Sequence, residues 1–242
     1  MNKINNCLII NLDSREDLWS KSLEFREKWK ASNKNVFRIS GIDLKKQTHN
    51  LNKFIISGRI DLNAKGFRRD KNSLLGELGC YLSHYDSWKY VVDNNLESCL
   101  ILEDGINILR NDYENLSINT NLDILFVNKE MEKFKPDPTK ISGFGLQSYI
   151  LTLKGAKKLL EVCYKLVLPI DLQLRNFCNS NILNGDVIDN PFAERNNTRI
   201  SSIENKVSET NDLNEKQNLN HNFFERIIIN LISKNINIDD FI

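Results

Sequence analysis

The stretch Ser98-Cys99-Leu100-Ile101-Leu102-Glu103-Asp104-Gly105 decides the fold class of this chain. Its apolar part is short and uninterrupted and ends in an acidic turn, a pattern that is typical of a buried strand in an α/β sheet. In open α/β sheets, ligands bind at the carboxyl ends of the strands. The stretch therefore predicts a strand over residues 98–102 and a binding site directly after it.

Strands and helices are expected to alternate around this central strand. Apolar runs predict further strands at residues 7–12, 36–39, 122–127 and 148–153, and apolar residues at helical spacing predict helices at residues 18–29, 78–92 and 154–166. Such alternation favours an α/β domain with a mostly parallel sheet flanked by helices. A length of 242 residues suits one such domain with a tail better than two domains.

The C-terminal part of the chain follows a different pattern. Residues 1–203 form the predicted domain, and residues 204–222 are polar without periodic apolar positions, which is typical of a linker. Residues 223–242 are a predicted helix and tail, with an apolar stripe formed by Phe223, Phe224, Ile227, Ile228 and Leu231. Because an amphipathic helix must bury its stripe, we expect this C-terminal helix to dock on its own domain or to form a homodimer with a second copy.

The charges of the chain nearly cancel, which argues against a general polyanion-binding role. There are 33 Lys and Arg residues and 32 Asp and Glu residues, for a net charge of +1. No overall field then attracts the chain to nucleic acid or to an anionic membrane. An anionic ligand must therefore be held by local groups.

The cysteines and the apolar runs indicate a soluble, cytoplasmic protein. The five cysteines are odd in number, scattered and mostly within apolar runs, which is typical of reduced core residues. The apolar run near the N-terminus is too short for a signal peptide, and no run reaches the roughly 20 residues of a membrane span. We therefore expect no membrane span and a cytoplasmic location.

Three acidic segments follow apolar runs and are the first candidates for a site. They are Asn11-Leu12-Asp13-Ser14-Arg15, Glu103-Asp104-Gly105 and Pro169-Ile170-Asp171. The second suits a divalent cation such as Mn²⁺ or Mg²⁺, because one or two carboxylates can hold the ion while it stabilises a diphosphate leaving group. A solvated acidic turn is the alternative interpretation of the same residues.

Several different sequence blocks follow one another in a characteristic order. The most specific is Gly76-Glu77-Leu78-Gly79-Cys80-Tyr81-Leu82-Ser83-His84-Tyr85-Asp86-Ser87-Trp88, followed by Leu100-Ile101-Leu102-Glu103-Asp104. Further blocks lie at residues 9–17, 37–43 and 154–160. In order and spacing these blocks resemble glycosyltransferase family 25, which includes lipopolysaccharide-type and collagen galactosyltransferases, and the resemblance covers about residues 5–205.

The resemblance implies a GT-A type fold and a glycosyltransferase that uses a UDP-sugar. It further implies transfer of a hexose, galactose or glucose, to a glycan or protein-linked acceptor, with inversion at the anomeric carbon. The donor diphosphate is expected to bind together with Mn²⁺ or Mg²⁺, and Asp104 is the expected metal ligand.

By the same resemblance, Asn11, Asp13 and Arg15 occupy the family's first strand-end motif and contact the nucleotide. Arg15 is expected either to reach a phosphate or the base, or to lie solvated on a first helical turn. Asp13 or Ser14 has the alternative role of a helix N-cap, which needs no ligand.

Glu77, Ser83 and His84 are expected to contact the donor from one helix. Positions 77, 80, 81, 84 and 88 share a helical face, which aims His84 at the site. The alternative for His84 is a hydrogen-bonded packing role. Tyr85 and Trp88 are expected in the core.

Arg69 lies in the basic segment Lys65-Gly66-Phe67-Arg68-Arg69-Asp70-Lys71, just before this helix. We expect either a loop that closes on the diphosphate or a solvated charged loop. The segment from Arg195 to Ile203 resembles the family's closing motif near the donor site.

Asp171 and Glu103 are the expected catalytic carboxylates. Inversion in a single displacement needs a base on the face opposite the leaving group. Asp171 follows Pro169 at a position where the family carries a carboxylate, so it is the candidate base. Metal ligation and acceptor binding are alternative roles for the same side chain.

Gly105 is the point at which the chain departs from the family, whose members usually carry a second aspartate there. Without that carboxylate we expect weaker metal binding. The alternative function is a catalytically impaired module that binds a nucleotide sugar or a glycan, or a scaffold. A nucleotide-binding protein that is indifferent to the sugar is a third hypothesis. The donor sugar, the acceptor and the linkage stay open, since they depend on pocket shape.

Overall fold

The computed structural model describes residues 1–47, 51–60, 71–134, 137–143 and 145–196. The predicted linker at residues 204–222, the C-terminal helix at residues 223–242 and Arg69 lie outside these residues.

A six-stranded sheet forms the centre of the molecule, in the order β11-β7-β10-β4-β2-β3. Its strands are β2 (Asn6–Leu12), β3 (Asn35–Gly41), β4 (Ser98–Glu103), β7 (Ile124–Phe126), β10 (Ser148–Thr152) and β11 (Gly185–Val187). β2 pairs in parallel with β3 and β4, and β11 pairs in parallel with β7. β10 runs antiparallel to both of its neighbours. The prediction of a mostly parallel sheet is confirmed, with one reversed strand in its middle.

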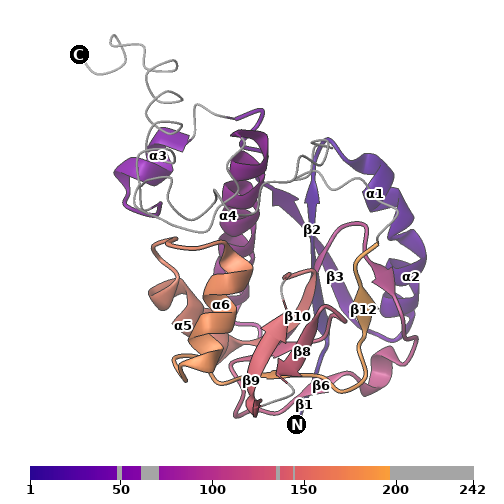
Figure 1. Cartoon of the computed structure of the whole chain (residues 1–242). Helices are drawn as coiled ribbons and strands as arrows, with labels where there is room; N and C mark the ends of the chain where they lie inside the picture. The colour runs from indigo at the N-terminus through magenta and orange to yellow at the C-terminus, as the bar shows by residue number, and fades with distance from the viewer. Residues whose placement is uncertain (48–50, 61–70, 135–136, 144, 197–242) are drawn as a thin grey trace, which may run out of the picture.

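Helices cover both faces of this sheet (Figure 1). One face carries α1 (Glu16–Lys21) and α2 (Leu23–Ala31), and the other carries α4 (Lys71–Asp93), α5 (Leu153–Val162) and α6 (Ile170–Asn179). A short helix α3 spans Leu51–Ile56, and a 3-10 turn spans Tyr113–Asn115. The arrangement confirms the α/β class.

Smaller strand pairs surround the central sheet. They are β1 (Asn2–Lys3) with β6 (Ser117–Ile118), β5 (Asn107–Ile108) with β12 (Ala193–Glu194), and the hairpin of β8 (Met131–Phe134) with β9 (Asp137–Gly143). All three pairs are antiparallel.

The apolar runs form central strands because both of their faces are buried. Alternate residues of β2 enter different cores: Leu8 and Ile10 face the cluster around α4, whereas Cys7 and Ile9 face the cluster around Phe25 and Trp29. β4 divides its residues in the same way. Each fully buried aliphatic side chain contributes roughly 1.5–3 kcal/mol relative to an exposed one. Burial of this kind requires helices on both sides.

Helix α4 buries a row of large apolar side chains against the sheet. Trp88 is fully buried and Tyr85 is 6% exposed, which confirms both as core residues. All five cysteines are free thiols, and all except the half-buried Cys80 are buried, as predicted for reduced core residues. Among the described residues, no helix is both long enough and apolar enough to cross a membrane.

Two predicted helices have different limits in the structure. The helix expected at residues 154–166 ends at Val162, because the residues after it make contacts with other parts of the chain. The Tyr81 hydroxyl contacts the carbonyls of Cys163 and Tyr164, and Leu166 pairs with Ile60. The helix expected at residues 18–29 is interrupted at Ser22 and becomes α1 and α2.

Candidate functional site

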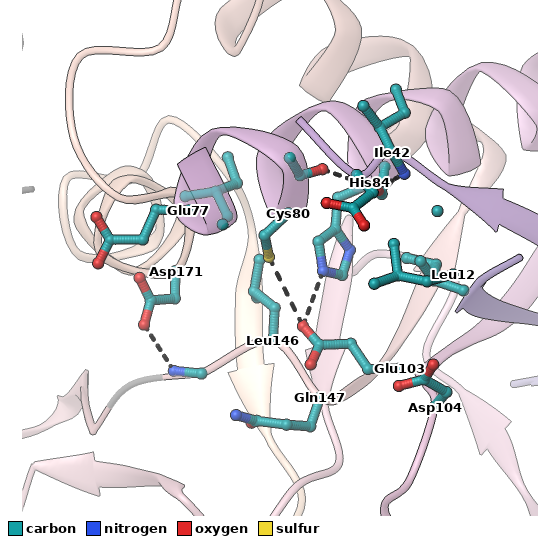
Figure 2. A pocket seen from close by; sticks show the side chains of 18 of the residues that line it. Leu12, Ile42, Glu77, Cys80, His84, Glu103, Asp104, Leu146, Gln147 and Asp171 are labelled. Carbon is teal, nitrogen blue, oxygen red and sulfur yellow. Dashed lines mark hydrogen bonds and ion pairs between the residues drawn. The ribbon is translucent and has the colours of Figure 1, made fainter. Parts of the chain in front are cut away.

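A pocket opens at the edge of the sheet where β2, β3 and β4 end (Figure 2). Because β10 is antiparallel, its first residues reach the same edge, with Ser148 opposite Leu102. The first turn of α6 and the N-terminal half of α4 complete the walls. The volume is about 290 Å³, near the lower end of the roughly 300–1,000 Å³ typical of small-molecule sites.

The walls of this pocket are acidic. Five carboxylates line it, those of Asp43, Glu77, Glu103, Asp104 and Asp171, against the two basic side chains of Lys45 and Arg195. Glu103 and Asp104 come from one strand end, and Glu77 and Asp171 come from two helices (Figure 2). An anionic ligand in this pocket therefore needs a cation or basic groups beyond the described walls.

Asp104 is held by residues from the two neighbouring strands. Its Oδ2 accepts a hydrogen bond of 2.7 Å from Nδ2 of Asn11, and its backbone N–H donates to the carbonyl of Ile10 at 2.9 Å. Arg38 on β3 donates in turn to Oδ1 of Asn11 at 2.6 Å. Asp104 is only 8% exposed, so this support fixes a carboxylate that is nearly buried yet lines the pocket.

Gly105 adopts a left-handed conformation, with φ of +69°. Glycine enters this region without strain, whereas most other residues do not. Asp and Asn are partial exceptions, since they populate it several-fold more often than other non-glycine residues. The turn is therefore compatible with an aspartate at this position at a moderate energetic cost.

Asn11, Asp13 and Arg15 do not line the pocket. Asn11 lies behind Asp104, as described. Asp13 accepts a hydrogen bond of 2.6 Å from the Ser40 hydroxyl. Arg15 donates two hydrogen bonds to Asp17, and hydrogen bonding to Arg15 is the largest cause that lowers the pKa of Asp17 to about 2.

The alternative role of Asp13 or Ser14 as an N-cap is wrong. The N-cap position of α1 is Arg15, and no side chain caps this helix end. The backbone N–H of Arg15 bonds to the carbonyl of Leu12, so the chain makes a tight turn before the helix begins. This turn moves the expected cap position by one residue.

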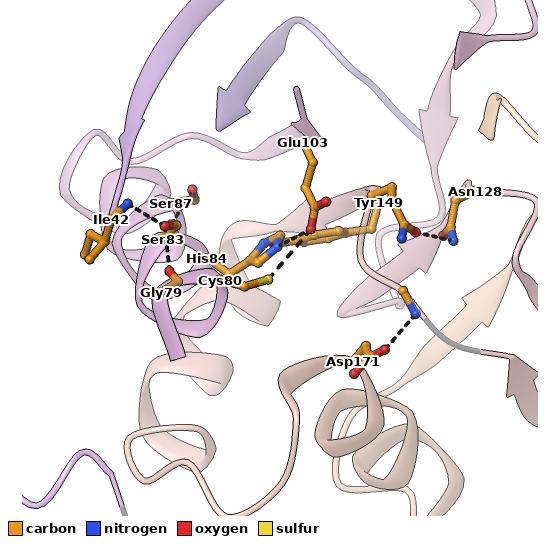
Figure 3. A network of polar contacts seen from close by, with 12 residues as sticks. Ile42, Gly79, Cys80, Ser83, His84, Ser87, Glu103, Asn128, Tyr149 and Asp171 are labelled. Carbon is orange, nitrogen blue, oxygen red and sulfur yellow. Dashed lines mark hydrogen bonds and ion pairs between the residues drawn. The ribbon is translucent and has the colours of Figure 1, made fainter. Parts of the chain in front are cut away.

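His84 joins helix α4 to Glu103 (Figure 3). Its Nε2 lies 3.2 Å from Oε1 of Glu103, and its Nδ1 lies 2.9 Å from the hydroxyl of Tyr149. The thiol of Cys80 donates to the same Glu103 oxygen at 3.8 Å. Burial raises the pKa of this thiol well above its usual range, and the nearby Glu103 adds to the effect, so the sulfur keeps its proton.

Ser83 and Gly79 attach helix α4 to the loop that follows β3. The Ser83 hydroxyl accepts from the backbone N–H of Ile42 at 2.8 Å and donates to the carbonyl of Gly79 at 2.7 Å. A Cβ atom on Gly79 would lie 2.4 Å from the carbonyl oxygen of Ile42, so only glycine permits this approach. The pair positions one wall of the pocket, although Ser83 itself is 3% exposed.

Asp171 holds the loop that leads into β10. It lies in the first turn of α6, where its Oδ2 accepts from the backbone N–H of Gly145 and its Oδ1 from that of Leu172, both at 2.9 Å. One turn later, Arg175 donates to the carbonyl of Gly143 at 2.8 Å. Helix α6 thus positions this loop of the pocket, and Figure 2 shows Asp171 beside Glu77.

Sequence reasoning missed several residues of the site. Arg38, Cys80, Tyr149 and Gln147 were not among the candidates, although Cys80 and Gln147 line the pocket. Cys80 lay within the most specific block and on the predicted helix face, which was a usable signal. Arg38 lay within the block at residues 37–43, but its contact with Asn11 depends on the pairing of β2 with β3. Tyr149 carries no such signal, because its contact with His84 joins elements far apart in the chain.

Comparison with known proteins adds a family match. Residues 4–174 match the family model described as Glycosyltransferase family 25 (LPS biosynthesis protein). Procollagen galactosyltransferase 1 of Danio rerio is 31% identical over 115 residues, covering 40% of this chain and 19% of that protein. Procollagen galactosyltransferase 2 of Homo sapiens is 30% identical over 115 residues, covering 40% and 18%.

A bacterial relative is similar over a comparable length. A putative glycosyltransferase of Haemophilus influenzae is 35% identical over 101 residues, covering 36% of each chain. The aligned part spans less than two fifths of each of these relatives.

Proposed function

The chain belongs to glycosyltransferase family 25, and we propose that it transfers a hexose from a UDP-sugar to a glycan or protein-linked acceptor, with inversion at the anomeric carbon. The observation that carries the proposal is the acidic pocket at the strand ends, with Asp104 held in its wall by Asn11. The names of the animal relatives support galactose, with glucose as the alternative. We propose a GT-A type fold as part of the same assignment.

The donor chemistry of the pocket fits a hard divalent cation. Asp104 offers a carboxylate oxygen at the wall, Glu103 offers a second beside it, and Gly105 offers none. Mg²⁺ commonly uses one or two protein carboxylates and takes its remaining ligands from water and phosphate. When bound, Mn²⁺ or Mg²⁺ would offset the charge of the donor diphosphate. Asp104 is the proposed ligand.

The proposed reaction is a single displacement. The acceptor hydroxyl oxygen forms a bond to the anomeric carbon while the bond from that carbon to the UDP oxygen breaks, and the bonding pair leaves with UDP. The hydroxyl proton passes to a carboxylate of the pocket. The pocket walls orient the two sugars and exclude water from the reacting carbon.

Glu103 and Asp171 are the proposed catalytic carboxylates, and the contacts favour Glu103 as the base. Its Oε1 lies 3.2 Å from Nε2 of His84, and its side chain is 31% exposed at the pocket. Both oxygens of Asp171 accept backbone N–H groups. Asp171 is therefore engaged in holding the Gly145 loop, and its role as the base is the alternative assignment.

The other predicted contacts stay predictions. Glu77 and His84 line the pocket and are proposed to approach the donor, and Ser83 is proposed to act by holding the wall. Arg195 lines the pocket, which supports the proposal that the closing motif lies near the donor. Contacts of Asn11, Asp13, Arg15 and Arg69 with the nucleotide, a cytoplasmic location and a homodimer through the C-terminal helix are further proposals.

Gly105 supports a second candidate function, a catalytically impaired module that binds a nucleotide sugar or glycan. Gly105 adopts a left-handed conformation and carries no carboxylate at the position where the family resemblance implies one. Such a module would be stabilised by UDP without turning over the donor. Stabilisation by UDP and UDP-sugar alike, without transfer, would instead favour the third hypothesis, a nucleotide site that is indifferent to the sugar.

Donor turnover tests these alternatives. UDP-galactose and UDP-glucose are incubated with the chain and Mn²⁺, with the chain and a chelator, and with the Asp104→Asn variant. We expect chelation and Asp104→Asn each to lower turnover by about 100-fold or more, since a metal contributes several kcal/mol to such steps. Asp189→Asn, at a carboxylate with a 96% exposed side chain, is the matched control. Equal rates in all four samples would reject the metal role.

A further inference from the structure

Behind Glu103 lies a line of side chains joined by hydrogen bonds, of which Figure 3 shows Tyr149, His84 and Glu103. Nε1 of Trp88 lies 2.8 Å from the hydroxyl oxygen of Tyr149, which lies 2.9 Å from Nδ1 of His84. Nε2 of His84 lies 3.2 Å from Oε1 of Glu103. Trp88, Tyr149 and His84 are at most 1% exposed, so water does not compete for the bonds between them. His84 and Glu103 both line the pocket, and the Glu103 side chain is the more exposed of the two, at 31%.

Donor and acceptor chemistry gives this line a direction. The indole of Trp88 is a donor only, so the Tyr149 oxygen accepts from it. The Tyr149 proton is then donated to Nδ1 of His84, its other hydrogen-bond partner. A neutral imidazole with Nδ1 as acceptor carries its proton on Nε2. His84 therefore donates to Oε1 of Glu103, which accepts as a carboxylate.

Two neighbouring groups are consistent with this direction. Burial raises the pKa of the Tyr149 phenol well above its usual range, so the hydroxyl keeps the proton that it donates. The Cys80 thiol is the second donor to Oε1 of Glu103, and it is protonated for the same reason. Two donors thus meet on one carboxylate oxygen.

We propose that Trp88, Tyr149 and His84 are positioning residues, which form a one-directional hydrogen-bond chain that presents the Glu103 carboxylate to the pocket as a proton acceptor. This hydrogen-bond chain orients Glu103 before any substrate binds, because Trp88, Tyr149 and His84 are buried between α4 and β10. Its consequence for catalysis rests on the proposed function, whereas the hydrogen-bond chain itself does not.

A metal site is the competing interpretation of the same atoms. The Sγ of Cys80, an imidazole nitrogen of His84 and a Glu103 oxygen lie within 4.8 Å of one another, a set that suits a thiophilic ion such as Zn²⁺. Metal binding would need a free lone pair on Nε2 of His84. In the hydrogen-bond chain, however, this nitrogen carries the proton. The two interpretations therefore require opposite tautomers of His84.

Nitrogen NMR of the full chain distinguishes these tautomers. The chain has three histidines, His49, His84 and His221, and the signal lost in His84→Gln identifies the relevant ring after ¹⁵N-histidine labelling. At neutral pH we expect the Nε2–H tautomer. Tyr149→Phe removes the donor to Nδ1 and should shift the Nδ1 resonance. Tyr81→Phe removes another buried hydroxyl of α4, which donates to the carbonyls of Cys163 and Tyr164 directly after α5, and should leave the His84 signals unchanged.

Three outcomes would overturn the proposal. They are a proton on Nδ1 of His84 in the wild-type chain, unchanged His84 resonances in Tyr149→Phe, and displacement of the His84 Nε2 signal by added Zn²⁺ alone. The last outcome would assign the cluster to a metal instead.

A kinetic measurement tests the catalytic consequence separately. With a UDP-sugar and acceptor that the wild-type chain turns over, Tyr149→Phe and Trp88→Phe should lower kcat about tenfold or more with little change in the donor KM, whereas Tyr81→Phe should change neither. A variant that is less stable but keeps the wild-type kcat would reject the positioning role. If the wild-type chain shows no transfer, the proposed function fails, while the NMR result still decides the hydrogen-bond chain.

Discussion

The side-chain nitrogen of Asn11 lies 2.7 Å from Oδ2 of Asp104, and this buried hydrogen bond joins the carboxyl ends of β2 and β4. Arg38 extends the contact to β3 by donating to the other end of the same amide. Three adjacent strands thus hold one carboxylate at the pocket. Asn11 supports the proposed metal ligand from behind.

Replacing Asn11 should weaken both the fold and the proposed metal site. Asn11→Leu leaves Oδ2 of Asp104 and the Arg38 guanidinium without their amide partner, so we expect a loss of about 1–3 kcal/mol in the free energy of unfolding. Mn²⁺ affinity should fall roughly 10–100-fold, as for other groups that orient metal ligands. Denaturant unfolding and calorimetric titration measure the two effects. Asn35→Ala, which removes an exposed amide contact on the next strand, should change neither.

Gly105→Asp should strengthen Mn²⁺ binding, because it supplies the second carboxylate that family members usually carry. The left-handed φ of +69° makes the substitution unfavourable by roughly 1 kcal/mol, which aspartate tolerates better than most residues. Gly105→Ala imposes at least as much backbone strain without a carboxylate and is the matched control. Equal Mn²⁺ affinities of the two variants in a calorimetric titration would show that the proposed ion binds elsewhere.

Gly79→Ala should distort the pocket wall. The added methyl group would lie 2.4 Å from the Ile42 carbonyl oxygen, which is backbone and cannot rotate away. Overpacking of this kind destabilises by about 1–3 kcal/mol, and the melting shift produced by UDP should shrink because the wall moves. Asn72→Ala, at an exposed position of the same helix, is the control. A wild-type UDP response in Gly79→Ala would mean that this wall does not contact the nucleotide.

Asp123 should make part of the free energy of unfolding sensitive to acid. Burial of its side chain would raise its pKa, but hydrogen bonds from the Asn184 N–H, Lys154 and Lys158 outweigh burial and lower that pKa. A carboxyl group with a depressed pKa in the folded state stabilises the fold above its unfolded pKa, near 3.9, and loses that contribution as the pH falls through the folded value.

Denaturant unfolding of Asp123→Asn tests this linkage. We expect the variant to lose about 1–3 kcal/mol near pH 7, and the difference from the wild-type chain should narrow below about pH 4. A constant difference from pH 7 down to pH 3 would contradict the linkage. Asp137→Asn, at an exposed carboxyl whose hydrogen bonds are local, should show a much smaller effect at every pH.

Most of the sheet was predictable because its strands are buried on both faces. A strand that faces two cores must be apolar at every position, and the runs in β2, β4 and β10 have this property. The reversal of β10 was not predictable, since an apolar run has no direction. The early end of α5 depends on contacts of Tyr81 and Ile60 that lie far away in the chain.

The sequence by itself determined where the site begins: an acidic pair at the end of a fully apolar strand, in the order of blocks that resembles the family. Only the tertiary structure decided what each neighbour does. Asn11 meets Asp104 across 93 residues, and Tyr149 meets His84 across 65. Side-chain hydrogen bonds between strands depend on sheet order and register, which local spacing does not encode. For that reason the hydrogen bond by which Asn11 supports the carboxylate at the pocket emerges only from the structure, whereas a contact of Asn11 with the nucleotide stays a prediction.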